Sequence, residues 1–365
     1  MTDKLVVVVL FGGRSSEHSI SCATAGGVLA AIDRDRYRVI PVGITIDGAF
    51  TLQPDDAALF ALSSGSLPSV PDNGSRVLWP ESAATRTLRV VDESGSMRDL
   101  GDIDVVFPIL HGRFGEDGTL QGMFEMLDLP YVGAGVLGSA LGMDKHFTKT
   151  VLQHSGIAVA PWITVTTAQW RADAAAVTGR VVAEFEWPVF VKPARAGSSV
   201  GVSRAIDTAS LATAIDAGLA EDSKVLVETA LVGREIECAV IAGRDGGAPR
   251  VSVAGEIVTP ADTFYDFEAK YLDPDTAALV CPAEITAHEL RTMQDLAARA
   301  FLAIDGTGLA RVDFFLTDQG FVVNELNTMP GFTPISMFPK CWLASGISYP
   351  ELLDELIHLG LTTPR

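Results

Sequence analysis

The sequence predicts a mixed α/β and α+β protein, in which an N-terminal parallel-sheet domain precedes two further lobes. Residues 5–11 (LVVVVLF) and 105–110 (VVFPIL) are continuous apolar runs that lead into glycine-containing loops. Such runs are typical of parallel strands that are buried on both faces. Residues 309–327 instead alternate around a tight turn at 317–320, which is the pattern of a half-buried hairpin. Because 365 residues suggest two or three domains, we expect divisions at 1–144, 145–227 and 228–365.

The first strand leads through two glycines into a helix that Ser15 or Ser16 could cap. Backbone N–H groups and the positive end of this helix would then face the carboxyl edge of the sheet, where α/β proteins bind ligands. Glu17 falls in the first turn of the predicted helix. It is either a ligand contact or an acid that complements the helix dipole.

The strand at 105–110 ends at a glycine-rich loop, HGRFGEDGT, in which Thr119 could cap the next helix. His111 begins this loop at the carboxyl end of the strand, so it is placed either to contact a ligand or to bond a loop carbonyl. Residues 37–46 form another predicted strand, whereas residues 51–100 read as loops and short strands.

A GxGxxG pattern at Gly133, Gly135 and Gly138 does not indicate a dinucleotide site. Such a site needs an acidic residue about 20 positions further on, and the chain has none there. A tight turn that leads towards a helix at 145–154, capped by Asp144, accounts for these glycines better.

The middle of the chain carries a possible nucleotide site. Lys192 ends a buried strand and is followed by the glycine- and serine-rich loop 194–202, which is an arrangement for phosphate or simply a hairpin turn. A Walker A loop, GxxxxGK[ST], does not occur in the sequence. Glu228 and Glu235 flank a turn and could hold ribose hydroxyls and an adenine amino group, or could face solvent.

Residues 263–275 (TFYDFEAKYLDPD) predict an active-site lid. Four aromatic side chains in a polar loop are more than a connector needs. The lid would bring Lys270 and Tyr271 over the site, although a surface loop packed by its own aromatics is the alternative. A long helix at 287–304 follows, and Pro350 suits the first turn of a C-terminal helix.

The hairpin at 309–327 predicts a metal site. If it closes symmetrically about Gln319, Asp313 lies opposite Glu325 and Arg311 lies opposite Asn327. Two close carboxylates repel each other unless a cation lies between them, and such oxygen ligands suit Mg²⁺. The alternative is an ordinary polar outer face. Strict alternation gives each strand one shared face: Arg311, Asp313 and Phe315 on the first, and Phe321, Val323, Glu325 and Asn327 on the second.

The composition excludes several classes of protein. A net charge of −19 argues against a protein that grips nucleic acid. No apolar run approaches the roughly 18 residues of a membrane helix, so we expect no membrane partner. The four cysteines are far apart and form no CxxC, which predicts buried free thiols in a reducing, cytoplasmic location.

Seven segments, taken together and in order, carry a family resemblance. The chain resembles the D-alanine–D-alanine ligases of the ATP-grasp superfamily, which implies a Rossmann-like N-terminal domain followed by a two-lobed ATP-grasp fold. The matching segments are FGGRSSEHSIS (11–21), HGRFGEDGT (111–119), GMDK (142–145), VFVKPARAGSSVGVS (189–203), VETALVGREIE (227–237), FYDFEAKYLDPD (264–275) and ARVDFFLTDQG…NELNTMPGFTPISM (310–337).

The resemblance implies an ATP-dependent ligation of two D-alanine molecules through an acyl phosphate, for peptidoglycan synthesis. It implies two Mg²⁺ ions, replaceable by Mn²⁺, on Asp313, Glu325 and Asn327. It assigns the nucleotide to Lys145, Lys192, Ser199, Glu228, Ala230, Leu231, Glu235, Lys270 and Asn324. It assigns the amino acids and the chemistry to Glu17, His111, Ser198, Tyr271, Arg311, Gly331, Ser336 and Met337.

Particular roles follow from the same resemblance. Glu17 would hold the first D-alanine ammonium, and Ser336 the second carboxylate. Arg311 and the Gly331 N–H would stabilise the oxyanion, while Ser198 would link Glu17 to the lid.

The resemblance also implies a homodimer, and it leaves rival functions open. Relatives that make D-alanyl-D-lactate lack the lid tyrosine, so Tyr271 favours a dipeptide product. The rivals are another ligase on the same fold and a regulatory nucleotide-binding protein without turnover.

Overall fold

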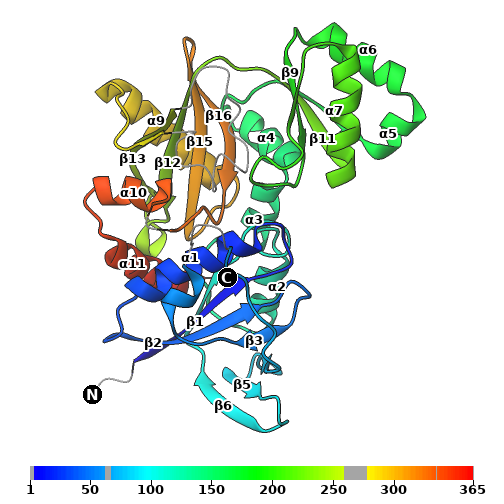
Figure 1. Cartoon of the computed structure of the whole chain (residues 1–365). Coiled ribbons are helices and arrows are strands. Elements are labelled where there is room, and N and C mark those ends of the chain that lie inside the picture. The colour runs from blue at the N-terminus through cyan, green and yellow to red at the C-terminus, as the bar shows by residue number, and fades with distance from the viewer. Residues whose placement is uncertain (1–3, 62–66, 259–277, 334, 365) are drawn as a thin grey trace.

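The computed structural model describes residues 4–61, 67–258, 278–333 and 335–364. These residues form a parallel-sheet domain, a small lobe and a large lobe (Figure 1). Within the described ranges, no helix has the length and apolar character needed to cross a membrane.

The N-terminal domain is built on the predicted parallel sheet. Its strand order is β3-β2-β1-β7, and β1 pairs in parallel with β2 and β7. The bounds are β1 (Leu5–Gly12), β2 (Tyr37–Ile44), β3 (Phe50–Leu52) and β7 (Val105–Ile109). The expectation of buried parallel strands at 5–11 and 105–110 is therefore confirmed.

The continuous apolar run of β1 serves two cores, one on each face of the sheet. Val7, Val9 and Phe11 pack in a core with residues of α1 (His18–Ala31) and α11 (Tyr349–Thr362). Val6, Val8 and Leu10 pack on the other side, with residues of α2 and β5. Because both faces of β1 are covered, a polar side chain at any of these positions would be buried without a hydrogen-bond partner. This explains why the apolar run is continuous rather than alternating.

The rest of this domain, and helix α4 that follows it, are short elements. A three-stranded antiparallel sheet, order β4-β5-β6, occupies the stretch predicted as loops and short strands. The bounds are η1 (Ala57–Phe60), β4 (Arg76–Leu78), β5 (Thr87–Val91), β6 (Met97–Asp102), α2 (Thr119–Met126), α3 (Val136–Met143) and α4 (Lys145–His154). The prediction that Thr119 caps α2 was wrong, because Gly118 occupies that position with a positive φ of 89°.

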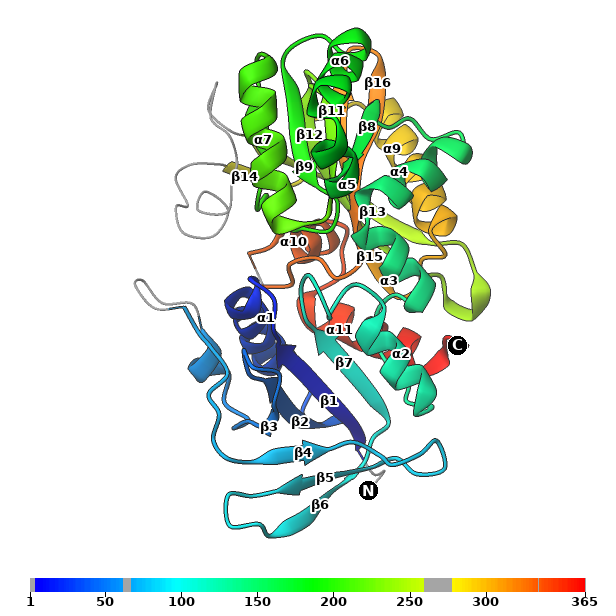
Figure 2. The ribbon, with the colours of Figure 1, turned by 90° about the vertical axis from the view of Figure 1, so that its right-hand side faces the viewer.

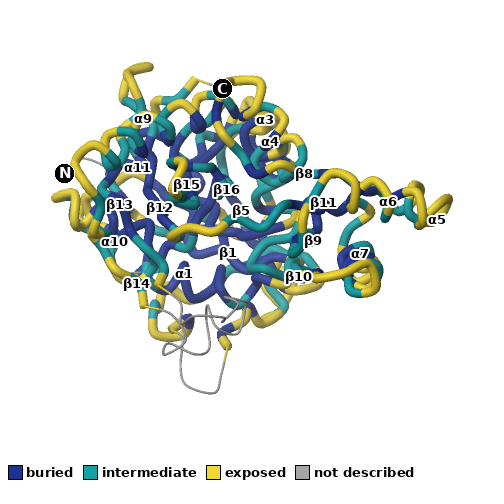
Figure 3. Tube along the Cα trace, turned by 90° about the horizontal axis from the view of Figure 1, so that it is seen from above, coloured by how far each residue is buried: buried dark blue, intermediate teal, exposed yellow. Residues whose placement is uncertain are grey.

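The small lobe is a four-stranded sheet, order β10-β9-β11-β8, with its own core and with helices packed on it. It projects away from the rest of the molecule in Figures 1 and 3, and it faces the viewer in Figure 2. The bounds are β8 (Trp162–Thr166), β9 (Val189–Pro193), β10 (Ser203–Ala205), β11 (Lys224–Thr229), α5 (Thr167–Ala172), α6 (Ala174–Glu184) and α7 (Thr208–Glu221).

The large lobe is a five-stranded sheet, order β14-β13-β12-β15-β16. Helices α4 and α9 pack on one side, and α10 lies on the other against β12 and β13, between this sheet and the N-terminal domain (Figure 1). The bounds are β12 (Arg234–Ile241), η2 (Arg244–Gly246), β13 (Arg250–Val258), β14 (Ala278–Val280), α9 (Ala287–Ala303), β15 (Leu309–Thr317), β16 (Gly320–Asn327) and α10 (Met337–Ala344).

The domain divisions at 144/145 and 227/228 stay predictions. Helix α4 follows the first division but packs on β16 and α9 of the large lobe, and the second division falls inside β11. The two lobes are therefore joined by shared elements near both positions.

The β15–β16 hairpin has the predicted pairs but not the predicted symmetry. Asp313 lies opposite Glu325 and Arg311 opposite Asn327, yet Thr317 pairs with Gly320. The turn is thus shorter than symmetric closure about Gln319 requires. A bulge in β16 compensates for the shorter turn. Asp313 pairs with Glu325 and Phe314 with Val323, so Asn324 has no ladder partner and the pairs beyond it return to the predicted register.

The bulge also corrects the predicted faces of β16. Phe321 and Val323 pack in the large-lobe core together with Leu326, whereas Glu325 and Asn327 line cavities on the other side. The four residues predicted to share one face therefore lie on two, because the extra residue shifts the alternation by one position.

Candidate active site

Most of the predicted nucleotide residues surround one cavity of about 310 Å³, called here the lysine cavity. It lies between the small-lobe sheet and the β15–β16 hairpin. Its lining includes Lys145, Lys192, Ser199, Glu228, Leu231, Glu235 and Asn324. Ala230 follows β11 but is not part of the lining, and Lys270 lies outside the described residues.

Two lysines point their ammonium groups at this cavity. Lys192 Nζ lies 3.0 Å from Glu228 Oε2 and donates to Asn324 Oδ1 at 3.2 Å. Lys145 Nζ donates to Ala196 O at 2.7 Å. Burial acts to lower the pKa of Lys192, but the Glu228 carboxylate outweighs it, so the pKa is raised and the lysine is cationic at neutral pH.

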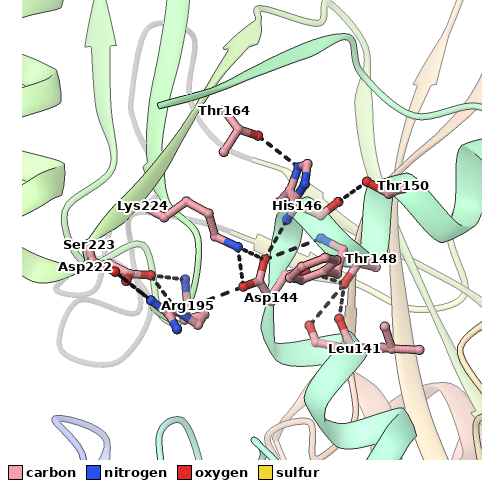
Figure 4. A network of polar contacts seen from close by, with 12 residues as sticks. Leu141, Asp144, His146, Thr148, Thr150, Thr164, Arg195, Asp222, Ser223 and Lys224 are labelled. Atoms are coloured by element: carbon pink, nitrogen blue, oxygen red, sulfur yellow. Dashed lines mark hydrogen bonds and ion pairs between the residues drawn. The ribbon is translucent and has the colours of Figure 1, made fainter. Parts of the chain in front are cut away.

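A polar network around Asp144 surrounds the start of α4 (Figure 4). Asp144 caps α4, as predicted, by accepting from the N–H groups of His146 and Phe147. Its carboxylate also accepts from Lys224 Nζ of β11 at 2.6 and 2.8 Å. The start of α4 is thus bound to the small lobe, which fixes the position of its first residue, Lys145.

The predicted amino-acid residues surround a second cavity of about 200 Å³, called here the arginine cavity. Its lining includes Glu17, His111, Ser198, Arg311, Gly331, Ser336 and Met337. Ser198 Oγ donates to Glu17 Oε1. Tyr271 lies outside the described residues.

Glu17 does not occupy the first turn of α1, and neither serine caps that helix. Glu17 is itself the N-cap residue, without a side-chain cap bond. Ser15 Oγ instead donates to His111 O at 2.7 Å, which ties the two glycine-containing loops together. A Cβ atom added to Gly112 or Gly197 would lie 2.8 or 2.9 Å from Glu17 Oε2, so both glycines leave space for this carboxylate.

His111 bonds a loop carbonyl, so that interpretation is confirmed; it also lines the arginine cavity, and its contact with a ligand stays a prediction. Its Nδ1 lies 3.0 Å from Met329 O. Burial lowers the pKa of His111, so the ring is neutral at neutral pH.

Glu116 was missed, although its loop was singled out as glycine-rich. Its carboxylate accepts from the N–H groups of Gly112, at 2.6 Å, and Met329, at 3.0 Å. Burial, helped by the nearby Glu17 charge, raises the pKa of Glu116 to about 8. The signal that could have found Glu116 is an acid five residues after His111 in the same glycine-rich loop.

Arg311 and Asp313 form the closest ion pair of the hairpin. The guanidinium donates to both Asp313 oxygens at 2.7 Å, and its Nε lies 3.2 Å from Glu237 Oε2. Asn327 Nδ2 donates to Asp313 Oδ2 at 3.0 Å. Glu237, which sequence reasoning did not assign, thus shares Arg311 with Asp313.

Glu325 and Asn327 lie where the two cavities approach each other. A gap of about 40 Å³ shares Lys145 and Glu325 with the lysine cavity, and shares Glu116 and Asn327 with the arginine cavity. Among the described residues, no three His, Cys, Asp or Glu side chains cluster as a metal site. Two carboxylates and one amide still fit Mg²⁺, which keeps positions open for water and phosphate oxygens.

The segment after the hairpin completes the arginine cavity. Ser336 Oγ lies 2.8 Å from Thr333 Oγ1 and accepts from Thr333 N at 3.2 Å. A Cβ atom added to Gly331 would lie 3.2 Å from Ser336 Oγ. Gly331 and Ser336 are therefore neighbours at one wall of the cavity.

Models of one protein family match nearly the whole chain. The model "D-ala D-ala ligase N-terminus" matches residues 6–134, and "D-ala D-ala ligase C-terminus" matches residues 151–358. A D-alanine–D-alanine ligase of Paenarthrobacter aurescens is 50% identical over 365 residues, which cover 99% of this chain and 96% of the relative.

Solved structures are similar over the same length. The D-alanine–D-alanine ligase from Coxiella burnetii has a TM-score of 0.81 at 35% identity, covering 99% of this chain and 94% of its own. A D-Ala:D-Ser ligase from Enterococcus faecalis has a TM-score of 0.83 at 32% identity, covering 98% and 100%. Sequence, family models and fold agree, and the chain belongs to the D-alanine–D-alanine ligase family.

Proposed function

We propose that this protein uses ATP to join two D-alanine molecules into D-alanyl-D-alanine, a peptidoglycan precursor, with release of ADP and phosphate. One observation carries the proposal: the lysine cavity and the arginine cavity meet at the gap beside Glu325 and Asn327. A triphosphate in the first cavity could therefore present its terminal phosphate to a carboxylate in the second.

The residues of the arginine cavity suit the two amino acids. Glu17 is a carboxylate for the ammonium of the first D-alanine, and Ser198 holds it in place. Ser336 offers a hydroxyl for the carboxylate of the second D-alanine. After phosphoryl transfer, the amine of the second molecule attacks the acyl phosphate, and Arg311 with the Gly331 N–H stabilises the oxyanion.

Glu325 and Asn327 of the gap, together with Asp313 opposite Glu325, suit Mg²⁺, for which Mn²⁺ could substitute. These three residues would hold two ions, whose chemistry is to offset the charge of the phosphates. Both Asp313 oxygens accept from Arg311, so the proposed oxyanion contact and a proposed metal ligand lie side by side. Lys145 and Lys192 would contact the phosphates directly, and Glu228 and Glu235 the adenosine.

A phosphate-release assay with MgATP tests the proposal. Release with D-alanine, together with D-alanyl-D-alanine in the product analysis, supports it. D-lactate, D-serine and L-alanine are the comparison substrates, because relatives on this fold differ in the second substrate. A preference for D-lactate or D-serine would identify a different ligase, and release with none of the four would contradict ligase activity.

Two further expectations come from the family. We expect a homodimer located in the cytoplasm, where ATP is available. Light scattering of the purified chain measures its mass in solution, and a monomer at the assay concentration would contradict the first expectation.

Replacing the carboxylates of Asp313 and Glu325 tests their assignment as metal ligands. Asp313→Asn and Glu325→Gln should each lower phosphate release by at least about a hundredfold, the scale for loss of one group that stabilises developing charge. Phosphate release is measured across a Mg²⁺ titration, and near-normal turnover in either variant would contradict the assignment.

A further inference from the structure

Lys149 is a buried cation that the proposed reaction does not use. It lies on α4, four residues after Lys145, and only 1% of it is exposed. Its Nζ lies 3.1 Å from Glu228 Oε1 and donates to Ala160 O at 3.2 Å. A buried ammonium group is costly unless it is paired, so this position requires Glu228.

Glu228 lies between two lysines. Its Oε1 faces Lys149 and its Oε2 lies 3.0 Å from Lys192 Nζ, while only 3% of Glu228 is exposed. Burial acts to raise the pKa of Glu228, but the two ammonium groups outweigh it and lower the pKa, so the carboxylate is ionised at neutral pH.

The two lysines differ in what a ligand can reach. Lys192 and Glu228 line the lysine cavity, whereas Lys149 does not. Phosphate in that cavity could therefore contact Lys192 but not Lys149. When Lys192 turns to phosphate, the Glu228 carboxylate keeps Lys149 as its remaining positive neighbour.

We propose that Lys149 is a positioning residue, which holds the Glu228 carboxylate towards the adenosine while Lys192 is engaged by phosphate. The inference rests on the proposed function, because it takes the lysine cavity as the nucleotide site. Glu228 then accepts hydrogen bonds from amino or hydroxyl groups of a purine nucleoside.

Comparing two ligands separates this role from a structural one. ADP carries phosphates that draw Lys192 away, whereas adenosine leaves Lys192 on Glu228. Lys149→Met should therefore weaken ADP binding about tenfold, the scale of a lost charge-assisted hydrogen bond, and adenosine binding at most about twofold. Calorimetry measures ADP, and competition against ADP measures adenosine.

The controls isolate the charge of Lys149. Lys149→Arg keeps a cation and should restore most of the ADP affinity. Lys4→Met removes an exposed lysine just before the first strand and should leave both affinities unchanged. In a Glu228→Gln background there is no charge to balance, so Lys149→Met should have little further effect on ADP.

Equal weakening of ADP and adenosine would overturn the inference, as would an unchanged ADP affinity. If Lys149→Met alone does not fold, the comparison of Glu228→Gln with the double variant decides: similar ADP affinities support the inference, and a weaker double variant contradicts it. These binding measurements need no turnover. Wild type that binds ADP without ligating D-alanine would count against the proposed function, not against the role of Lys149.

Discussion

At the scale of single residues, the site depends on space as much as on charge. Glu17 reaches the arginine cavity from the N-terminal domain, while its partner Ser198 comes from the small lobe. Two glycines, Gly112 and Gly197, stand where a side chain would meet its carboxylate. The absence of a side chain at both positions therefore leaves room for the carboxylate that we propose binds the first D-alanine.

A methyl group at Gly197 should displace the Glu17 carboxylate. Gly197→Ala places a Cβ 2.9 Å from Glu17 Oε2, so the KM for D-alanine should rise at least about tenfold, the effect of about 1.4 kcal/mol. Gly179→Ala is the matched control: a Cβ there meets nothing within 4 Å, and the position is inside α6. The control should keep its KM and be slightly stabilised. Equal KM values in the two variants would contradict the role of the space at Gly197.

Glu116 should make stability fall as the pH rises. Its pKa in the fold, about 8, is above the ordinary value of 4.5, so between these values the folded state keeps a proton that the unfolded state has lost. The stabilisation is complete below pH 4.5 and is lost as the pH rises through 8, with a slope of at most about 1.4 kcal/mol per pH unit.

Urea unfolding from pH 5 to 8, without Mg²⁺ or nucleotide, measures this dependence. Glu116→Gln cannot titrate, so its stability should fall less over this range than that of the wild type. Identical pH profiles of the two proteins would mean that the carboxyl group ionises at its ordinary pKa.

At the scale of elements, helix α4 connects the two lobes. Its N-cap, Asp144, is bound by Lys224 of the small lobe, while its apolar side packs in the large-lobe core through Leu152. Lys145 and Lys149 both project from it. One short helix therefore carries the proposed phosphate contact and the buried cation behind Glu228.

Removing the cap of α4 should affect nucleotide binding more than an ordinary cap does. Asp144→Ala should cost about 1 kcal/mol for the cap alone and should raise the KM for ATP, because Lys145 loses its fixed position. Asp207 caps α7 in the same lobe with a similar side-chain bond, to Ser210 N at 2.8 Å. Asp207→Ala should lose comparable stability with an unchanged KM. Thermal melts and initial rates measure both quantities, and equal KM values would refute the special role of this cap.

The sequence best predicted those elements whose residue pattern has a single physical explanation. The continuous apolar run of β1 is explained only by a strand that is buried on both faces. Asp144 before residues 145–154 is explained by its role as the N-cap of a helix. Helices α3 and α10 were not predicted, because glycines and prolines around them resemble loops.

The hairpin pairs and the turn at 317–320 were predicted correctly, although symmetric closure about Gln319 was wrong. A two-residue turn and a bulge at Asn324 have opposite effects on the register, so symmetric closure gave the right partners for Asp313 and Arg311. The faces of β16 were wrong because alternation cannot reveal a bulge. Lys149 was missed since its partner Glu228 comes from a distant part of the chain, whereas Glu116 was missed although it bonds Gly112 of its own loop.

At the scale of the whole molecule, the hydrophobic cores do not follow the boundaries between the sheets. One core contains Val7 of the N-terminal sheet, Ile241 of the large-lobe sheet and Leu356 of α11. The small lobe has a separate core, which includes Val191 and Val227. The N-terminal domain and the large lobe should therefore unfold together, and the small lobe should open independently.

Hydrogen exchange in increasing urea tests this division. Amides of β9 and β11 should exchange at lower urea concentrations than those of β1 and β12, because the small lobe can open without the shared core. Mg²⁺ with ADP should reduce the difference in urea concentration between these two pairs of strands, since a nucleotide between the lobes stabilises the closed state of both. Simultaneous exchange of all four strands without ligand would show one cooperative unit.

The packing of α11 on the first sheet has a consequence for synthesis on the ribosome. Strands β1, β2 and β7 emerge early, but the core on one of their faces contains Leu352 and Leu356 of α11, which emerges late. Until then, that face of the nascent sheet is covered by α1 without α11, and part of its apolar core stays exposed. The N-terminal segment is thus a natural client for chaperones during translation, and its native state is completed only after the catalytic lobes have been made.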